Sequence, residues 1–189
     1  METTLYIKNM VCDRCIRVVQ DELVKLGYDV NQIKLGEATI GSTAKSVNLN
    51  EIKNVLKENG FELIDSKNAK MIEKIKVLII NKIHHQDDDL TRFNFSKYLS
   101  KEMGVNYSHL STVFSSFEGT TIEKFIIKQK IEKVKELLTY NELTLSEISY
   151  KLGYSSVQHL SNQFKQVTGL NPSHFKKFKQ LRRRPLDMV

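Results

Sequence analysis

The chain has 189 residues with a formal net charge of +7, and 40% of its residues are hydrophobic and 27% charged, a composition typical of a folded soluble protein. It contains no apolar run long enough for a membrane-spanning helix. Its first residues lack the basic and apolar stretches of a secretory signal. We therefore expect a cytoplasmic protein with no membrane partner.

Charge is unevenly distributed along the chain. Residues 1–68 hold 9 Lys and Arg against 10 Asp and Glu, a net charge of −1. Residues 69–189 hold 20 against 12, a net charge of +8. A basic segment beside a neutral one is typical of a polyanion-binding module attached to a second domain. Because lysine is also a common solvating residue, charge alone leaves both interpretations open.

The first 66 residues predict four short strands and two helices. Alternating apolar residues indicate the strands, and apolar residues at three- and four-residue steps indicate the helices. Asn48 with Glu51 predicts a capping box at the start of the second helix. The expected strands cover residues 4–9, 30–35, 37–40 and 61–64, and the expected helices cover residues 15–26 and 48–60. The resulting β-α-β-β-α-β order is a ferredoxin-like pattern.

Cys12 and Cys15 are the only cysteines in the sequence, and their Cys-x-x-Cys motif lies between the first strand and the first helix. In a reducing compartment this spacing indicates metal or redox chemistry rather than a disulfide scaffold. A helix N-terminus favours thiolates, so we expect lowered pKa values there. Two thiolates on one loop can hold a soft ion, Cu(I) or, with further ligands, Zn(II). A thiol redox switch and a structural pair are the alternatives.

Residues 66–70 predict a polar link, and residues 71–84 predict a helix with one apolar side. The polar run from His84 to Asp89 follows this helix. Its histidines and aspartates are candidate metal ligands across domains, although we favour a solvated linker. After this run the sequence predicts only helices and short turns.

Residues 95–125 nearly repeat themselves at 145–175, at a constant offset of fifty positions. A helix over residues 122–139 joins the two similar units, which suit two nearby patches on duplex DNA. Capping boxes are predicted at Thr120 with Glu123 and at Thr144 with Glu147. The repeated residues include Ser96 and Ser146, Lys101 and Lys151, His109 and His159, Phe114 and Phe164, Gly119 and Gly169, and Phe125 and Phe175.

The second unit predicts a helix-turn-helix pair, with helices over 144–152 and 156–168 and a short turn that contains Gly153. On the later helix Leu160, Phe164 and Val167 share the inward side. Gln and Asn can bond bidentately to adenine and Val can meet a thymine methyl, whereas lysine suits phosphate. The candidate DNA contacts on the outward side are Val157, Gln158, Ser161, Asn162 and Lys165.

The first unit places Leu110, Phe114 and Phe117 inward by the same spacing. Its outward side is small and polar and has no basic residue, so we expect weaker or more shape-dependent reading there. The candidate DNA contacts are Tyr107, Ser108, Ser111, Thr112 and Ser115. Residues expected to pack or to contact phosphate are His109, His159, Lys97, Lys101, Lys151 and the basic residues within 176–184.

Residues 88–182 resemble the DNA-binding domain of the AraC/XylS family. The resemblance rests on the stretches Leu145–Tyr154, Gln163–Lys165 and Thr168–Phe175, with Ser149 where the family usually has Ala. It implies two helix-turn-helix units whose second helices enter successive major grooves of double-stranded DNA. RNA polymerase is a further candidate partner.

Residues 4–65 resemble the heavy-metal-associated domain of metallochaperones and metal-transporting ATPases. The shared features are the Met10-x-Cys12-x-x-Cys15 loop and the β-α-β-β-α-β order, while Asn9 stands where relatives have Gly. The resemblance implies that Cys12 and Cys15 are metal ligands.

The sequence thus predicts an α+β chain, a small ferredoxin-like domain followed by an all-α double helix-turn-helix domain. The expected parts are a domain over 1–66, a linker and helix over 67–87, the DNA-binding domain over 88–182 and a tail over 183–189. We expect a sequence-specific DNA-binding regulator of transcription, an activator or a repressor, monomeric or homodimeric, that requires no cofactor and responds to a soft metal ion or to thiol redox state. Because no nucleophile–base pair, phosphate loop or paired carboxylates are evident, we do not expect an enzyme. The alternative is a thiol redox or metal-delivery protein whose helical half is a docking module.

Overall fold

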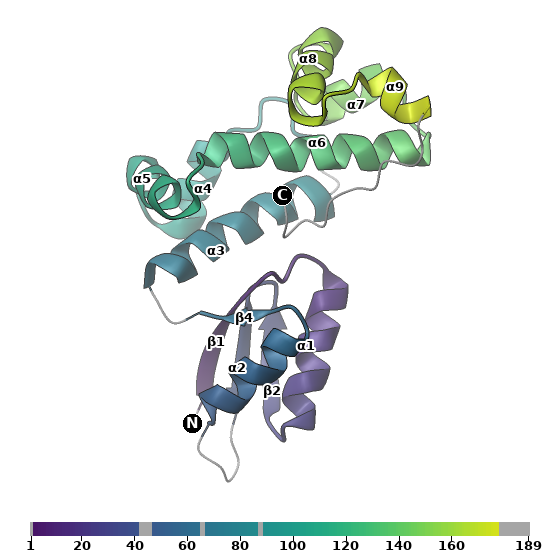
Figure 1. Cartoon of the computed structure of the whole chain (residues 1–189). Coiled ribbons are helices and arrows are strands. Elements are labelled where there is room, and N and C mark those ends of the chain that lie inside the picture. The colour runs from purple at the N-terminus through teal and green to yellow at the C-terminus, as the bar shows by residue number, and fades with distance from the viewer. Residues whose placement is uncertain (1, 42–46, 65–66, 87–88, 178–189) are drawn as a thin grey trace. The chain divides into compact units, whose positions relative to one another are not determined.

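The computed structural model describes residues 2–41, 47–64, 67–86 and 89–177. The chain forms two units, residues 1–77 and 78–189, and it passes from one to the other within a helix. Figure 1 shows the sheet of the first unit and the helices of the second. Within the described residues, no helix combines the length and apolar character needed to span a bilayer.

The first unit is built on a four-stranded antiparallel sheet with the strand order β2-β3-β1-β4. Alternation places Leu5 and Ile7 on one face, where Val19 and Leu23 of α1 and Leu56 of α2 pack against them. These helices and strands follow the order expected from the sequence, and their bounds differ from expectation by a few residues. The elements are β1 (Glu2–Lys8), α1 (Asp13–Lys25), β2 (Asp29–Lys34), β3 (Glu37–Gly41), α2 (Leu49–Glu58) and β4 (Glu62–Leu63).

A third helix, α3 (Lys67–Ile80), belongs to the first unit as far as Val77. The Lys70 ammonium lies 4.3 Å from the centre of the Tyr6 ring, and Val77 packs beside Gly36. The expectation of a polar link up to residue 70 is wrong, since the helix begins at Lys67 and its first turn already packs on the sheet. A π-helical segment that the sequence did not predict, η1 (Asn81–His85), continues from α3.

The second unit is helical, and its two halves keep the offset of fifty residues. Figure 1 shows α4 and α5 at one end of the long helix α6, and α7, α8 and α9 along the rest of it. The Phe114 ring of α5 lies tilted against the Phe125 ring of α6, and the Phe164 ring of α8 meets the Phe175 ring of α9 edge-on. The helices are α4 (Phe95–Met103), α5 (Tyr107–Glu118), α6 (Ile122–Tyr140), α7 (Leu145–Lys151), α8 (Val157–Thr168) and α9 (Pro172–Lys177).

The ends of these helices correct three sequence predictions. The N-cap of α6 is Thr121, which accepts from the Lys124 amide, and not Thr120. Phe117 and Val167 are 58% and 41% exposed and not inward, because each lies in the last turn of its helix, beyond the core. The predicted capping box of Thr144 with Glu147 is confirmed.

Candidate nucleic-acid interface

Helices α5 and α8 have matching ends and matching buried sides. Each has 12 residues, begins after an Asn or Ser whose side chain accepts from a backbone amide, and ends at a glycine in the left-handed conformation. Leu110 and Phe114 of α5 and Leu160 and Phe164 of α8 are fully buried. The hydrophobic effect therefore fixes the same side of both helices inward, and their opposite sides face solvent.

The solvent side of α8 carries amide and lysine side chains. Gln158, Asn162 and Lys165 are exposed, while Val157 and Ser161 are partly buried. Nε2 of Gln158 donates to Oδ1 of Asn162 over 2.9 Å. This contact leaves Oε1 of Gln158 as an acceptor and Nδ2 of Asn162 as a donor. An acceptor beside a donor complements the major-groove edge of adenine.

His159 is held at the start of α8. Its Nδ1 lies 3.0 Å from Oγ of Ser155, and its ring meets the edge of the Tyr154 ring at 5.5 Å. The side chain is exposed, so it lies beside the solvent side of α8 and does not pack in the core. Its role in phosphate contact stays a prediction.

On α5 two hydroxyl groups are bonded to the helix backbone. Oγ1 of Thr112 donates to the Ser108 carbonyl over 2.9 Å, and Oγ of Ser116 donates to the Thr112 carbonyl over 2.9 Å. Ser108 and Thr112 are exposed, and Ser111 and Ser115 are partly buried. The Thr112 hydroxyl can still accept a hydrogen bond from a base edge, but its proton is already donated to the helix.

Tyr107 is bonded within the protein and not only exposed to solvent. Its hydroxyl donates to Oε1 of Glu123 over 2.5 Å. Partial burial and, after it, this hydrogen bond raise the pKa of Tyr107, and the same bond lowers the pKa of Glu123. As a DNA contact Tyr107 would have to give up or share this bond, so we rank it below Ser108 and Thr112.

Basic residues around these helices are mostly exposed. Lys97 and Lys101 on α4 and Lys176 and Lys177 on α9 are exposed, whereas Lys151 on α7 is partly buried. The remaining basic tail, Lys179 and Arg182–Arg184, lies outside the described residues. The exposed lysines can attract phosphate without reading sequence.

The sulfur atoms of Cys12 and Cys15 lie 3.6 Å apart at the start of α1. Burial outweighs two backbone hydrogen bonds and raises the pKa of the Cys15 thiol. The expectation of a lowered pKa is therefore wrong for Cys15. Met10 is fully buried in the core. Among the described residues, no cluster of three or more His, Cys, Asp or Glu side chains is placed to hold a metal ion.

The loop before the cysteines is fixed by Asn9. Its φ of 72° lies in the left-handed region, which Asn tolerates better than most residues and which explains how it replaces Gly. Its amide donates to Oε1 of the buried Glu73 on α3 over 3.2 Å, and its side chain donates to the Gly60 carbonyl over 3.0 Å. Glu73 is a site residue that the sequence analysis missed.

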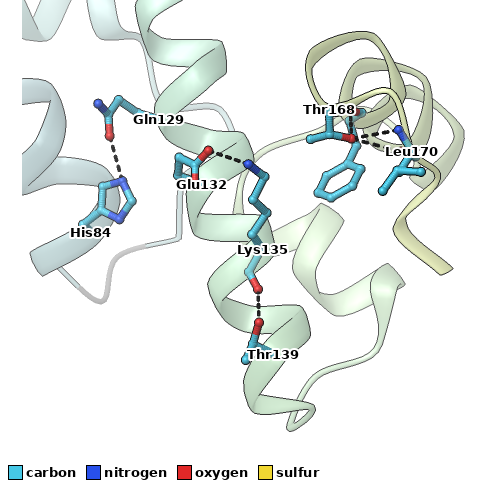
Figure 2. A network of polar contacts seen from close by, with 8 residues as sticks. His84, Gln129, Glu132, Lys135, Thr139, Thr168 and Leu170 are labelled. Carbon is cyan, nitrogen blue, oxygen red and sulfur yellow. Dashed lines mark hydrogen bonds and ion pairs between the residues drawn. The ribbon is translucent and has the colours of Figure 1, made fainter. Parts of the chain in front are cut away.

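His84 is part of the helical core of the second unit and not of a solvated linker. Its side chain is 3% exposed, and its Nε2 lies 3.0 Å from Oε1 of Gln129 on α6 (Figure 2). Burial lowers the pKa of His84. The linker expectation is wrong here because α6 supplies a polar partner that admits the ring to the interior. Asp87 and Asp88 lie outside the described residues.

Comparison with known proteins identifies the type of the second unit. Residues 99–177 match the family model described as a helix-turn-helix domain. An HTH-type transcriptional regulator of Staphylococcus aureus is 30% identical over 92 residues, which are 49% of this chain and 12% of that protein. The xylose operon regulatory protein of Escherichia coli is 32% identical over 74 residues, which are 39% of this chain and 19% of that protein.

A solved structure shows the same fold. The C-terminal domain of AraT, a response regulator from Geobacillus stearothermophilus, superposes with a TM-score of 0.51 at 21% identity, covering 62% of this chain and 92% of that one. The second unit therefore contains a helix-turn-helix domain over residues 99–177 and has the fold of that solved domain. The chain spans less than a fifth of the length of the curated relatives that it matches.

Proposed function

We propose that the chain is a cytoplasmic transcription regulator that binds a specific site on double-stranded DNA through α5 and α8. The observation that carries the proposal is the exposed pair of Gln158 and Asn162 on the second helix of a helix-turn-helix unit, with Lys165 one turn further on. Amides that can contact base edges and a lysine that can contact phosphate are the two components of sequence-specific binding.

A selection of DNA fragments from a random pool tests this proposal. The full chain should enrich one motif, and footprinting should cover two neighbouring segments on one face of the duplex. A Gln158→Ala/Asn162→Ala form should enrich a degenerate motif or none. Gln166→Ala is the matched control, since it removes an exposed amide elsewhere on the same helix. Recovery of the starting pool by the unaltered chain would refute DNA reading.

For the first unit we infer a ferredoxin-like, heavy-metal-associated type of domain that senses a soft ion or thiol oxidation at Cys12 and Cys15. Two sulfurs 3.6 Å apart fit an ion that accepts two thiolates, such as Cu(I), while Zn(II) needs further ligands. Asn9 ties the loop before Cys12 to Glu73 of α3. A change at the thiols can therefore reach α3 through one hydrogen bond.

The test of this sensor is DNA affinity with and without Cu(I) or Zn(II). The ion should change the affinity of the unaltered chain, while a Cys12→Ser/Cys15→Ser form should not respond. Glu73→Gln should weaken the response without removing ion binding, and Glu58→Gln, at an exposed position of α2, is its control. Equal responses of the unaltered chain and the Cys12→Ser/Cys15→Ser form would remove the sensor role.

A rival function is thiol oxidoreduction or metal delivery, with the helical unit as a docking module. The same cysteine pair supports it. It predicts dithiol turnover or transfer of Cu(I) to an acceptor chelator at equal rates with and without DNA. Regulation, not catalysis, is favoured because the amide and lysine side chains of α8 have no role in such a reaction. Contact of the DNA-bound chain with RNA polymerase would make it an activator.

A further inference from the structure

Lys130, in the middle of α6, is a partly buried lysine that contacts both helix-turn-helix units. Its ammonium donates to the carbonyl of Leu152, in the turn of the second helix-turn-helix unit, over 2.7 Å. The same nitrogen lies 5.3 Å from the centre of the Tyr154 ring and 5.9 Å from the centre of the Phe95 ring. Phe95 begins α4. One side chain of the linking helix therefore contacts both the first helix-turn-helix unit and the turn of the second helix-turn-helix unit.

The turn of the second helix-turn-helix unit is also held by the segment that precedes α4. The Leu90 amide donates to the Lys151 carbonyl over 2.9 Å, and Oγ1 of Thr91 donates to the Tyr150 carbonyl over 3.0 Å. At Gly153 a Cβ atom would lie only 2.3 Å from the Leu90 oxygen. The segment thus passes directly over the turn, and Lys130 holds the same turn from α6.

These contacts extend to α8. Tyr154, over whose ring Lys130 lies, meets the His159 ring edge-on at 5.5 Å, and His159 lies in the first turn of α8. The first helix-turn-helix unit is therefore connected to the start of α8 through Phe95, Lys130, Tyr154 and His159. In the first helix-turn-helix unit the equivalent positions are Gly104 for Tyr154 and Val105 for Ser155. They offer His109 neither the ring nor the hydroxyl.

The ammonium is difficult to replace at this position. Burial lowers the pKa of Lys130 to about 8, so its charge is retained against a desolvation penalty. A single carbonyl and two aromatic faces stabilise it. An apolar side chain of similar length could fill the space but could not bind the Leu152 carbonyl.

We propose that Lys130 is a positioning residue that fixes α8 relative to α5 and thereby sets the spacing between the two DNA segments that the protein accepts. The proposal depends on the DNA-binding function proposed above. A rigid arrangement matches one separation along the duplex, because each inserted base pair both shifts and rotates one segment against the other. A loosened arrangement tolerates more than one separation.

The first test measures affinity for the selected DNA motif with zero, one or two base pairs inserted between the two footprinted segments. We expect the unaltered chain to lose at least about tenfold in affinity per inserted pair, the size of a mismatched contact. Lys130→Met should show a much flatter dependence, and Lys130→Arg, which keeps a charged donor, should restore it. Lys128→Met, at an exposed position of α6, should resemble the unaltered chain.

The second test does not require DNA. Spin labels at Ser116→Cys on α5 and Gln166→Cys on α8, both exposed and fifty residues apart, report the distance between the two helices in a Cys12→Ser/Cys15→Ser background. Lys130→Met should broaden the distance distribution while circular dichroism shows unchanged helix content, and Lys128→Met should not. Identical distributions, or identical spacing dependence on DNA, would overturn the role of Lys130. Failure of the unaltered chain to select any DNA would instead refute the proposed function.

Discussion

The two helix-turn-helix units share a scaffold but differ in what they present to solvent and in how firmly they are held. Both second helices bury a Leu and a Phe and end at a left-handed glycine. On α5, Thr112 and Ser116 donate their hydroxyls to the helix backbone, whereas α8 exposes the amides of Gln158 and Asn162. A repeat can therefore keep its core while the two copies present different hydrogen-bonding groups to solvent. We expect the second helix-turn-helix unit to recognise the DNA sequence and the first helix-turn-helix unit to anchor the protein on DNA.

The largest expected difference between the units concerns their turn glycines. Both are in the left-handed conformation, but a Cβ at Gly104 would meet no atom within 4 Å, whereas one at Gly153 would meet the Leu90 backbone. Gly104→Ala should lower the free energy of unfolding by about 1–2 kcal/mol, the cost of that conformation. Gly153→Ala should add about 1–3 kcal/mol of overpacking to that loss. Urea denaturation of both variants measures this, and equal losses would show that the segment over Gly153 gives way freely.

The second prediction concerns the pH dependence of stability that arises from Lys130, which binds the turn of the second helix-turn-helix unit. Burial lowers its pKa to about 8 from 10.5, so between these values the unfolded chain holds a proton that the folded chain has lost. The free energy of unfolding therefore rises with pH across this window, by about 3 kcal/mol from Lys130 alone. Urea denaturation from pH 8 to 10.5 should show that rise in the unaltered chain and in Lys128→Met but not in Lys130→Met. Parallel pH curves for all three proteins would mean that Lys130 is solvated.

The third difference concerns base reading. Asn162→Ala and Gln158→Ala should each reduce affinity for the selected motif by about 1–3 kcal/mol and relax preference at one position. Ser111→Ala and Thr112→Ala on α5 should change affinity by much less, since Ser111 is partly buried and the Thr112 hydroxyl is donated to the Ser108 carbonyl. Binding titrations on a panel of single-base variants measure this. A larger loss from the α5 variants would reverse our assignment of the two units.

The smallest effect is expected from phosphate contact. Lys165→Ala should weaken binding to all sequences alike and reduce the slope of log affinity against log salt by about one. Ser115→Ala, the equivalent position of α5, should leave that slope unchanged. Affinities measured at several salt concentrations decide this, and a sequence-dependent loss from Lys165→Ala would make it a base-reading residue.

Much of the fold follows from periodicity, and the exceptions have physical reasons. Leu160 and Phe164 were predictable because a continuous helix repeats its buried side, but Val167 was not, since the core ends before the helix does. Lys130 could have been suspected, because it lies three residues after Ile127 and four before Val134 on the apolar stripe. His84 and Glu73 could not, because their partners Gln129 and Asn9 are distant in sequence. The raised pKa of Cys15 likewise depends on burial that spacing does not reveal.

The central claim is that the second helix-turn-helix unit reads bases through Gln158 and Asn162. Its most direct test is the ratio of the affinity for the selected motif to that for a scrambled duplex of the same composition, at one moderate salt concentration. We predict a ratio of at least about a thousand for the unaltered chain, and a ratio near one for Gln158→Ala/Asn162→Ala with binding to the scrambled duplex unchanged. Equal affinities of the unaltered chain for both duplexes, or a ratio that survives the double substitution, would contradict the claim.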